Sequence, residues 1–200
     1  MNKVTCDLSV SLDGFAAGTG QRLDAPFGDG VGEDGHDLHR WMFESPEEHA
    51  DELAGVTAAG AYVMGRNMFT PGRGAWDLSW TGWWGPNPPY HGPVFVLTHH
   101  ERASVDMEGG TTFHFVTDGP EVALERARAA AGEKHVAITG GAATVNQYLA
   151  AGLIDELRLH VTPVVVGRGE RLFAGVGHTR LRLLSSRCTP EVNHLTYGKA

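Results

Sequence analysis

The chain has 200 residues, of which 42% are hydrophobic and 20% are charged, a balance typical of a globular protein that buries its core without disulfide bonds. The formal net charge of -8 argues against nucleic acid as a general partner, because binding to a phosphate backbone requires concentrated lysine and arginine. No window approaches the roughly 18 apolar residues of a membrane span, and the N-terminus lacks the apolar segment of a signal peptide, so we expect no membrane partner and a cytoplasmic location.

The first half of the chain alternates between predicted strands, helices and long loops. Valine, cysteine and leucine occupy alternate positions near the N-terminus, which is typical of a strand. Ser45, Pro46 and Glu48 have the pattern of a capping box, which predicts the start of a helix. In chain order we expect a strand at 4–10, a glycine-rich loop at 18–35, a helix at 37–43, a helix from 45 to about 60, a strand at 61–64, a long excursion at 71–93 and a strand at 94–98.

The second half predicts strands and helices in alternation, followed by a hairpin. Gly152 marks the end of one helix, and Pro163 implies an edge, a bulge or a kink in a long strand. We expect strands at 111–117, 136–139 and 156–166, helices at 120–131 and 142–151, and a final antiparallel pair at 181–187 and 192–197. This order predicts an α/β sandwich, in one domain of residues 1–200, whose mixed and mainly parallel sheet ends in an antiparallel C-terminal hairpin.

A glycine pair, Gly140-Gly141, follows one predicted strand and opens a helix. The free N–H groups and the positive end of a helix can hold a phosphate, and glycine lets a ligand approach the backbone closely. Thr144 could add a hydroxyl group. A tight turn without a ligand is the alternative, and it is favoured for the glycine pair taken alone.

Polar residues follow three other predicted strands, and ligands of open α/β sheets collect at the carboxyl ends of strands. Arg66 can present a planar guanidinium group to a phosphate, and Arg102 with two neighbouring histidines forms a local positive segment. Asp13 could bind a substrate or assist protonation, or it could only close a turn with Gly14. Each signal is weak alone, and their shared position is what favours a site.

Residues 76–92 carry four of the five tryptophans. These side chains could cover the core, line a pocket for a flat ligand or contact a partner, and the sequence leaves the three readings open. The histidines at 36 and 39 and at 99 and 100 lack carboxylate or cysteine partners, so we predict no metal site. Cys6 and Cys188 are expected to be small core residues.

Five motifs follow one another along the chain: SLDGF, GRNMF, VLTHH, TGGAATVNQYL and LIDELRLHVTPVVVGRGERLF. Their order resembles the dihydrofolate reductase superfamily, and it is most similar to the reductase domain of bacterial riboflavin biosynthesis and its stand-alone relatives. The resemblance covers nearly the whole chain and is most specific at 138–173. It implies a three-layer sandwich that binds NADPH at the strand ends and forms a homodimer.

The resemblance also implies roles for individual residues. Arg66 would face the 2′-phosphate of the cofactor, and Asp13 and Asp37 are the candidate catalytic groups for proton transfer. The cofactor would contact Gly65, Arg66, Asn67, Thr98, His99 and Arg102, and its pyrophosphate would be held by Gly140, Gly141, Ala142, Ala143 and Thr144. Substrate would be bound by Asp13, Phe15, Trp41 and Met42.

Two departures from the family pattern bear on the ligands. Met68 stands where folate reductases usually have a threonine, which removes one hydroxyl contact to NADPH, and Phe15 stands where the riboflavin enzymes usually have a basic residue. The first hypothesis is an NADPH-dependent reductase of a C=N or C=O bond in a small, flat substrate resembling a pterin or a pyrimidine. The alternatives are a nucleotide-binding or ligand-sensing protein without turnover and a flavin-binding reductase that stacks its cofactor on the tryptophan loop.

Overall fold

The computed structural model describes residues 2–33 and 35–200. The first half of the chain folds into short helices between strands. Its elements are β1 (Val4–Ser11), β2 (Phe15–Ala17), η1 (Asp37–His39), α1 (Arg40–Phe43), α2 (Ala50–Val56), β3 (Ala61–Gly65), α3 (Arg66–Phe69) and β4 (Pro93–Leu97).

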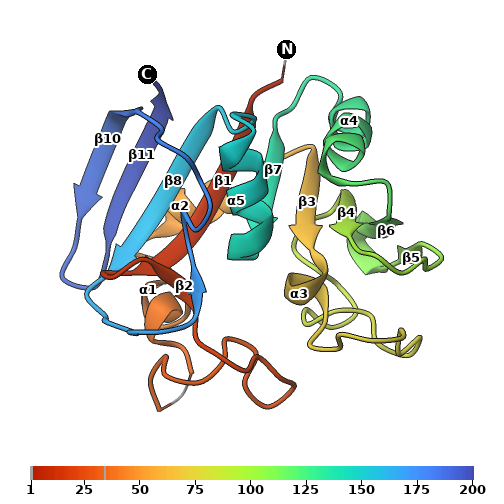
Figure 1. The fold of residues 1–200 in the computed structure, drawn as a ribbon, viewed down its shortest axis with the longest axis horizontal. Coiled ribbons are helices and arrows are strands. Elements are labelled where there is room, and N and C mark those ends of the chain that lie inside the picture. The colour runs from red at the N-terminus through yellow and green to blue at the C-terminus, as the bar shows by residue number, and fades with distance from the viewer. Residues whose placement is uncertain (1, 34) are drawn as a thin grey trace.

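The second half contains the two longest helices and the hairpin (Figure 1). Its elements are β5 (Val105–Asp106), η2 (Glu108–Gly110), β6 (Thr112–Val116), α4 (Pro120–Ala131), β7 (Val136–Gly140), α5 (Ala142–Ala150), β8 (Glu156–Thr162), β9 (Glu170–Arg171), β10 (Leu181–Cys188) and β11 (Asn193–Lys199). None of the helices in these described ranges has the length and apolarity that crossing a membrane requires.

Nine of the described strands form one sheet in the order β10-β11-β8-β1-β7-β3-β4-β6-β5. The pairs β8-β1, β1-β7, β7-β3, β3-β4 and β4-β6 are parallel, whereas β10 and β11 pair antiparallel to each other and β11 pairs antiparallel to β8. Helices α4 and α5 cover one face of the sheet, and α1 and α2 lie on the other (Figure 1). This architecture confirms the predicted three-layer α/β sandwich with a mainly parallel sheet and an antiparallel C-terminal hairpin.

Two hydrophobic clusters hold the layers together. The first packs α4 and α5 onto the centre of the sheet, with Val63, Ile138 and Tyr148 fully buried. The second lies around Phe69 and Phe113 at the β4-β6 side of the sheet, and three tryptophans of the 76–92 segment pack against it. These tryptophans therefore cover part of the core, which is one of the readings that the sequence left open.

Several element ends differ from the predictions. Helix α2 begins at Ala50, and the Ser45 hydroxyl donates a hydrogen bond to the carboxylate of Glu191 at 3.3 Å, so the predicted capping box is wrong. Strand β8 ends at Thr162, one residue before a proline that cannot donate to a strand ladder, and it does not reach residue 166.

The two cysteines have opposite environments. Cys6 lies in the core, and burial raises the pKa of its thiol, as the neighbouring charge of Asp7 also does. Cys188 is exposed at the end of β10, so its expected place in the core is wrong.

Candidate functional site

The carboxyl ends of β1, β7, β3 and β4 lie side by side at one edge of the sheet because these strands are parallel neighbours. The edge therefore brings together Asp13, the glycine pair, Arg66 and Thr98, which are far apart in the sequence. This confirms the physical premise on which the candidate site rested, that polar residues after separate strands share one edge.

The glycine pair forms the entrance to helix α5. Gly140 has a φ of 126°, a region that favours glycine, and it is joined to Gly141 by a cis peptide bond. No side chain caps α5, and the Thr144 N–H donates to the Gly141 carbonyl at 3.0 Å, so the N–H groups of Ala142 and Ala143 are left for a ligand. A Cβ atom added to Gly141 would meet no other atom within 4 Å, which shows that this backbone faces open space.

Gly65 brings the end of β3 against the first turn of α5. A Cβ atom at Gly65 would collide with the Thr144 hydroxyl oxygen, so glycine is required for this approach. Thr144 is buried and packs the helix onto the strand. Met68 lies beside the glycine pair, because a Cβ atom at Gly140 would be 3.3 Å from the Met68 sulfur atom.

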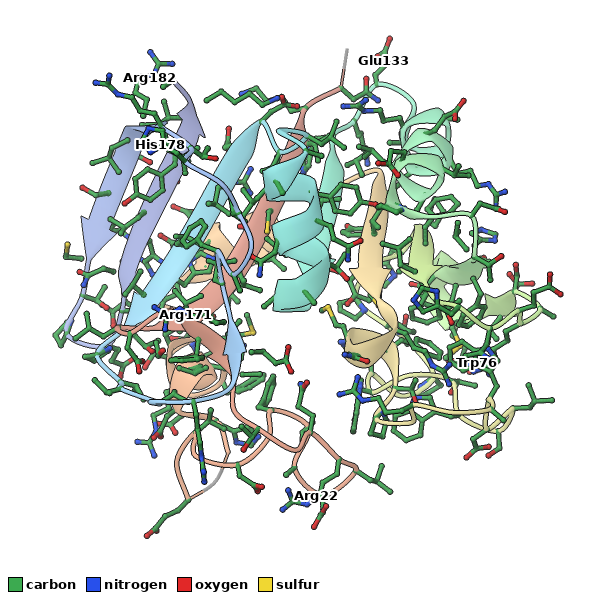
Figure 2. The ribbon with its side chains drawn as sticks, viewed as in Figure 1. Arg22, Trp76, Glu133, Arg171, His178 and Arg182 are labelled. Carbon is green, nitrogen blue, oxygen red and sulfur yellow. The ribbon has the colours of Figure 1, made fainter. Side chains whose placement is uncertain are left out.

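Arg66 begins helix α3 and stacks on Trp76, which Figure 2 labels. Its guanidinium carbon lies 3.9 Å from the centre of the Trp76 ring, and its Nη2 donates to the Gly74 carbonyl at 2.5 Å. Its Nε is buried and has no hydrogen-bond partner among the described residues. Burial lowers the pKa of the Arg66 guanidinium, and the charge of Arg73 lowers it further.

Arg102 reaches the same tryptophan from the loop after β4. Its guanidinium carbon is 5.1 Å from the Trp76 ring centre, and its Nη2 donates to the Trp80 carbonyl at 2.6 Å. Its Nη1 is buried and, within the described chain, also lacks a partner. Two half-buried guanidinium groups therefore lie beside one aromatic ring, and their combined positive charge can attract an anion.

The remaining candidate cofactor residues lie around these two elements. Thr98 is buried at the end of β4, where its hydroxyl oxygen accepts a hydrogen bond from the His100 N–H at 3.1 Å and closes a turn. His99, Asn67 and Ala143 are exposed, and Ala142 is buried in the first turn of α5.

Asp13 holds a turn together. Its carboxylate accepts hydrogen bonds from the Ser11 hydroxyl at 2.6 Å and from the N–H groups of Val166 and Gly167 at 3.0 and 2.7 Å. The hydrogen bond from Ser11 is the main cause that lowers the pKa of Asp13 to about 2. A carboxylate that stays ionised and is occupied in this way does not fit the proton-donor role predicted from the sequence.

The other candidate acid also has a local partner. Asp37 accepts a hydrogen bond from Arg40 Nε at 3.1 Å, and its carboxyl group lies against Gly32. Phe15 is buried in β2 beneath the guanidinium group of Arg171, at 5.1 Å from ring centre to Cζ.

Trp41 corrects the interpretation of the first helix. Its side chain is fully buried, and its Nε1 donates to the Ser9 hydroxyl at 3.1 Å on the α1 side of the sheet. It packs against His49, His160 and His194 and so belongs to the core, which contradicts the predicted substrate wall. Met42 beside it is half-buried.

Trp76 and Ser11 are site residues to which the sequence assigned no individual role. The run of tryptophans marked the segment that contains Trp76, but nothing in the spacing indicated that it would lie beside two arginines. Ser11 is part of the SLDG motif, yet its hydrogen bond to Asp13 emerges only from the turn geometry.

The chain is similar to known proteins over nearly its whole length. The model of the RibD C-terminal domain family matches residues 2–195. The chain is 24% identical over 196 residues to the uncharacterized protein YyaP of Bacillus subtilis (strain 168), covering 92% of this chain and 88% of that protein.

Solved structures share the fold. A protein from Shewanella sp. PV-4 that is provisionally assigned to riboflavin biosynthesis is 22% identical, with a TM-score of 0.65 and 99% of each chain covered. Dihydrofolate reductase from Enterococcus faecalis, complexed with NADP(H) and RAB-propyl, is 13% identical with a TM-score of 0.58, covering 98% of this chain and 95% of that chain. These comparisons confirm the resemblance drawn from the motifs, and the chain belongs to the RibD C-terminal domain family.

Proposed function

We propose that the protein is an NADPH-dependent reductase. The observation that carries this proposal is the pair Arg66 and Arg102, each of which keeps a buried, unpartnered guanidinium nitrogen beside Trp76 in the described structure. The uncapped start of α5 lies next to them across Gly65. Two neighbouring anion sites suit a dinucleotide that carries both a pyrophosphate and a 2′-phosphate.

Different residues would bind different parts of the cofactor. Arg66, with Gly65 and Asn67, would hold the 2′-phosphate, and Thr98, His99 and Arg102 would lie along the adenosine half. The first turn of α5 would hold the pyrophosphate through Gly140, Gly141, Ala142 and Ala143, with Thr144 fixing the helix to β3. NADPH supplies the hydride when it is bound, and the protein orients it against the substrate.

The substrate in this proposal is a small, flat molecule with a C=N or C=O bond, resembling a pterin or a pyrimidine. The folate and riboflavin-biosynthesis names of the similar structures support this class. Asp13 would order the turn at Val166 and Gly167 next to the reacting centre. Water would deliver the proton, because the Asp13 carboxylate is already ionised and occupied.

We further propose that the chain acts as one domain and as a homodimer. Strand β10 is an edge strand, and its side chains Leu183 and Leu184 are 53% and 47% exposed. An exposed edge with apolar side chains can pair with a second copy. Size-exclusion chromatography with light scattering checks this part separately.

Two assays test the reductase. Tryptophan fluorescence is titrated with NADPH, NADH and FMN, and we expect NADPH to quench it at the lowest concentration because Trp76 lies beside Arg66. The absorbance of NADPH is then followed with dihydrofolate and with a panel of pterins and aldehydes. A protein that does not bind NADPH contradicts the proposal, and binding without any oxidation favours a ligand-sensing role.

A further inference from the structure

A cluster of three metal-ligating side chains lies on the α1 and α2 side of the sheet. His49 precedes α2, Glu52 lies within it and His194 comes from β11. One ligand atom from each of them lies within 4.8 Å of the others. His49 Nδ1 is 2.9 Å from His194 Nε2, and His194 Nε2 is 4.0 Å from the Glu52 carboxylate.

A positive group already stands between two of these ligands. Arg187 Nη2 is 2.8 Å from His49 Nδ1 and 2.7 Å from Glu52 Oε2. A guanidinium group can only donate, so His49 Nδ1 presents its lone pair toward this point. The same lone pair also points toward His194 Nε2, and one lone pair cannot accept a good hydrogen bond from both Arg187 and His194. A metal ion would accept the lone pairs of both histidines at once.

The second ring nitrogen of His194, Nδ1, is linked through His160 to the carboxylate of Asp7. When His194 Nε2 carries a lone pair, its proton is on Nδ1, which lies 2.7 Å from His160 Nδ1. His160 then accepts that proton's hydrogen bond and carries its own proton on Nε2, which is 3.8 Å from the Asp7 carboxylate. Metal-ligating histidines usually have such a partner, which fixes the tautomer.

The second ring nitrogen of His49, Nε2, also lies near a carboxylate. Its Nε2 is 4.0 Å from the Glu191 carboxylate. The Nε2 atoms of His49 and His160 are both buried and lack a hydrogen-bond partner among the described residues. Each of these two buried nitrogens therefore faces an acidic side chain that stabilises a proton there.

We propose that His49, Glu52 and His194 form a binding site for Zn²⁺ or a similar divalent transition metal, which enters when the Arg187 side chain swings into solvent. Two histidines and one carboxylate are a ligand set of zinc sites that keep a fourth position open. The Arg187 side chain is 41% exposed and can leave, and Trp41 packs against both histidine ligands from the core side. A cavity of about 370 Å³ lies beside the cluster, and its lining includes Glu52, Arg187 and His194.

This site is independent of the proposed cofactor site. On β1, Ser9 points toward the face of the sheet that carries the three metal-ligating residues. Cys6 and Val10 occupy the alternate positions of the strand and point toward the opposite face, where α5 and the first hydrophobic cluster lie. Spacing along the sequence predicted no metal site because His49 and His194 are 145 residues apart. The segment before α2 packs onto β11, and this contact brings them together.

The test uses Zn²⁺ alone, titrated by calorimetry into the full chain after treatment with a chelator, and Co²⁺ as a spectroscopic probe. We expect one Zn²⁺ to bind the wild type, with visible Co²⁺ absorption typical of tetrahedral coordination. Glu52→Gln and His194→Ala should each weaken binding by at least about 100-fold, the upper end of what losing an outer partner costs. Arg187→Gln should bind at least as tightly as the wild type, because the competing cation is gone.

A double substitution of two exposed histidines, His100→Ala with His178→Ala, is the matched control and should leave Zn²⁺ binding unchanged. The proposal is overturned if Glu52→Gln binds like the wild type, or if neither the wild type nor Arg187→Gln binds Zn²⁺. Thermal unfolding of every variant verifies the fold. If His194→Ala does not fold, the comparison between Glu52→Gln and Arg187→Gln decides the question.

Discussion

The guanidinium group of Arg66 lies over the ring of Trp76, with 3.9 Å between its central carbon and the ring centre. This contact fixes a long, flexible side chain at the end of β3, and the hydrogen bond to the Gly74 carbonyl fixes one of its nitrogens. The remaining donors keep a defined direction. Preorganisation of this kind lowers the entropy that a charged side chain loses on binding an anion.

Arg66→Ala tests which part of the cofactor this arginine contacts. A charge-assisted hydrogen bond contributes about 1.5–3 kcal/mol, so the dissociation constant for NADPH should rise roughly 10- to 150-fold. The dissociation constant for NADH should change little, because NADH lacks the 2′-phosphate. Fluorescence titration with both dinucleotides measures the two effects. Arg182→Ala, an exposed arginine on β10, is the control, and equal losses for NADPH and NADH would show that Arg66 does not contact the 2′-phosphate.

Trp76→Phe and Trp76→Ala test whether the ring positions Arg66. An aromatic face attracts a cation by about 0.5–2 kcal/mol, which corresponds to roughly 2- to 30-fold in affinity. We expect the alanine variant to lose this much NADPH affinity and the phenylalanine variant to lose part of it. Equilibrium dialysis measures both, since the substitution removes the tryptophan whose quenching is expected to report NADPH binding. In the Arg66→Ala background, Trp76→Ala should have little further effect, and a full additive loss would mean that Trp76 contacts the cofactor itself.

Much of the fold follows from local patterns, and the exceptions have long-range causes. Residues 120–131 were predicted as a helix from a proline at its start and charges that match its dipole, and α4 has those bounds. Helix α2 starts five residues after Ser45, and the Ser45 hydroxyl donates instead to Glu191, which lies 146 residues away. No local propensity could anticipate that contact.

The candidate site shows the same division. The shared edge of Gly140, Arg66 and Thr98 could be predicted, because parallel strands end at the same side of a sheet. The burial and the hydrogen bonds of each side chain at this edge could not be predicted. Trp41 has the helical spacing from which a pocket wall was predicted, but its side chain lies in the core. Asp13 has the carboxyl group of a possible acid, but that group accepts hydrogen bonds from two backbone N–H groups of a distant turn.

Gly65→Ala and Gly141→Ala form a matched pair that separates packing from binding. At Gly65 the new methyl group meets the Thr144 hydroxyl, and overpacking of this kind costs about 1–3 kcal/mol, so urea unfolding should show a clear loss of stability. At Gly141 the methyl group meets nothing within 4 Å and φ is -69°, so the fold should tolerate it. NADPH binding should nevertheless weaken, because the methyl group projects into the space proposed for the pyrophosphate.

Thr144→Ala provides the control for the first half of that pair. The double variant Gly65→Ala with Thr144→Ala should recover most of the stability that Gly65→Ala loses. If Gly141→Ala instead binds NADPH like the wild type, the start of α5 does not hold the pyrophosphate.

Asp13→Asn distinguishes a turn anchor from a proton donor. The pKa of Asp13 is lowered to about 2 by the hydrogen bond from Ser11 and those from the Val166 and Gly167 N–H groups, against an ordinary value of 3.8. A lowered pKa in the folded state means that the ionised form stabilises the fold above about pH 4, and that this contribution is lost as the pH falls toward 2. The variant should therefore be less stable than the wild type at pH 7, and the difference should shrink as the pH falls from 4 to 2 in urea unfolding experiments. Turnover per folded molecule should survive, because water delivers the proton in the proposed reaction. A variant that keeps its stability and NADPH affinity but loses turnover would return Asp13 to the role of catalytic acid.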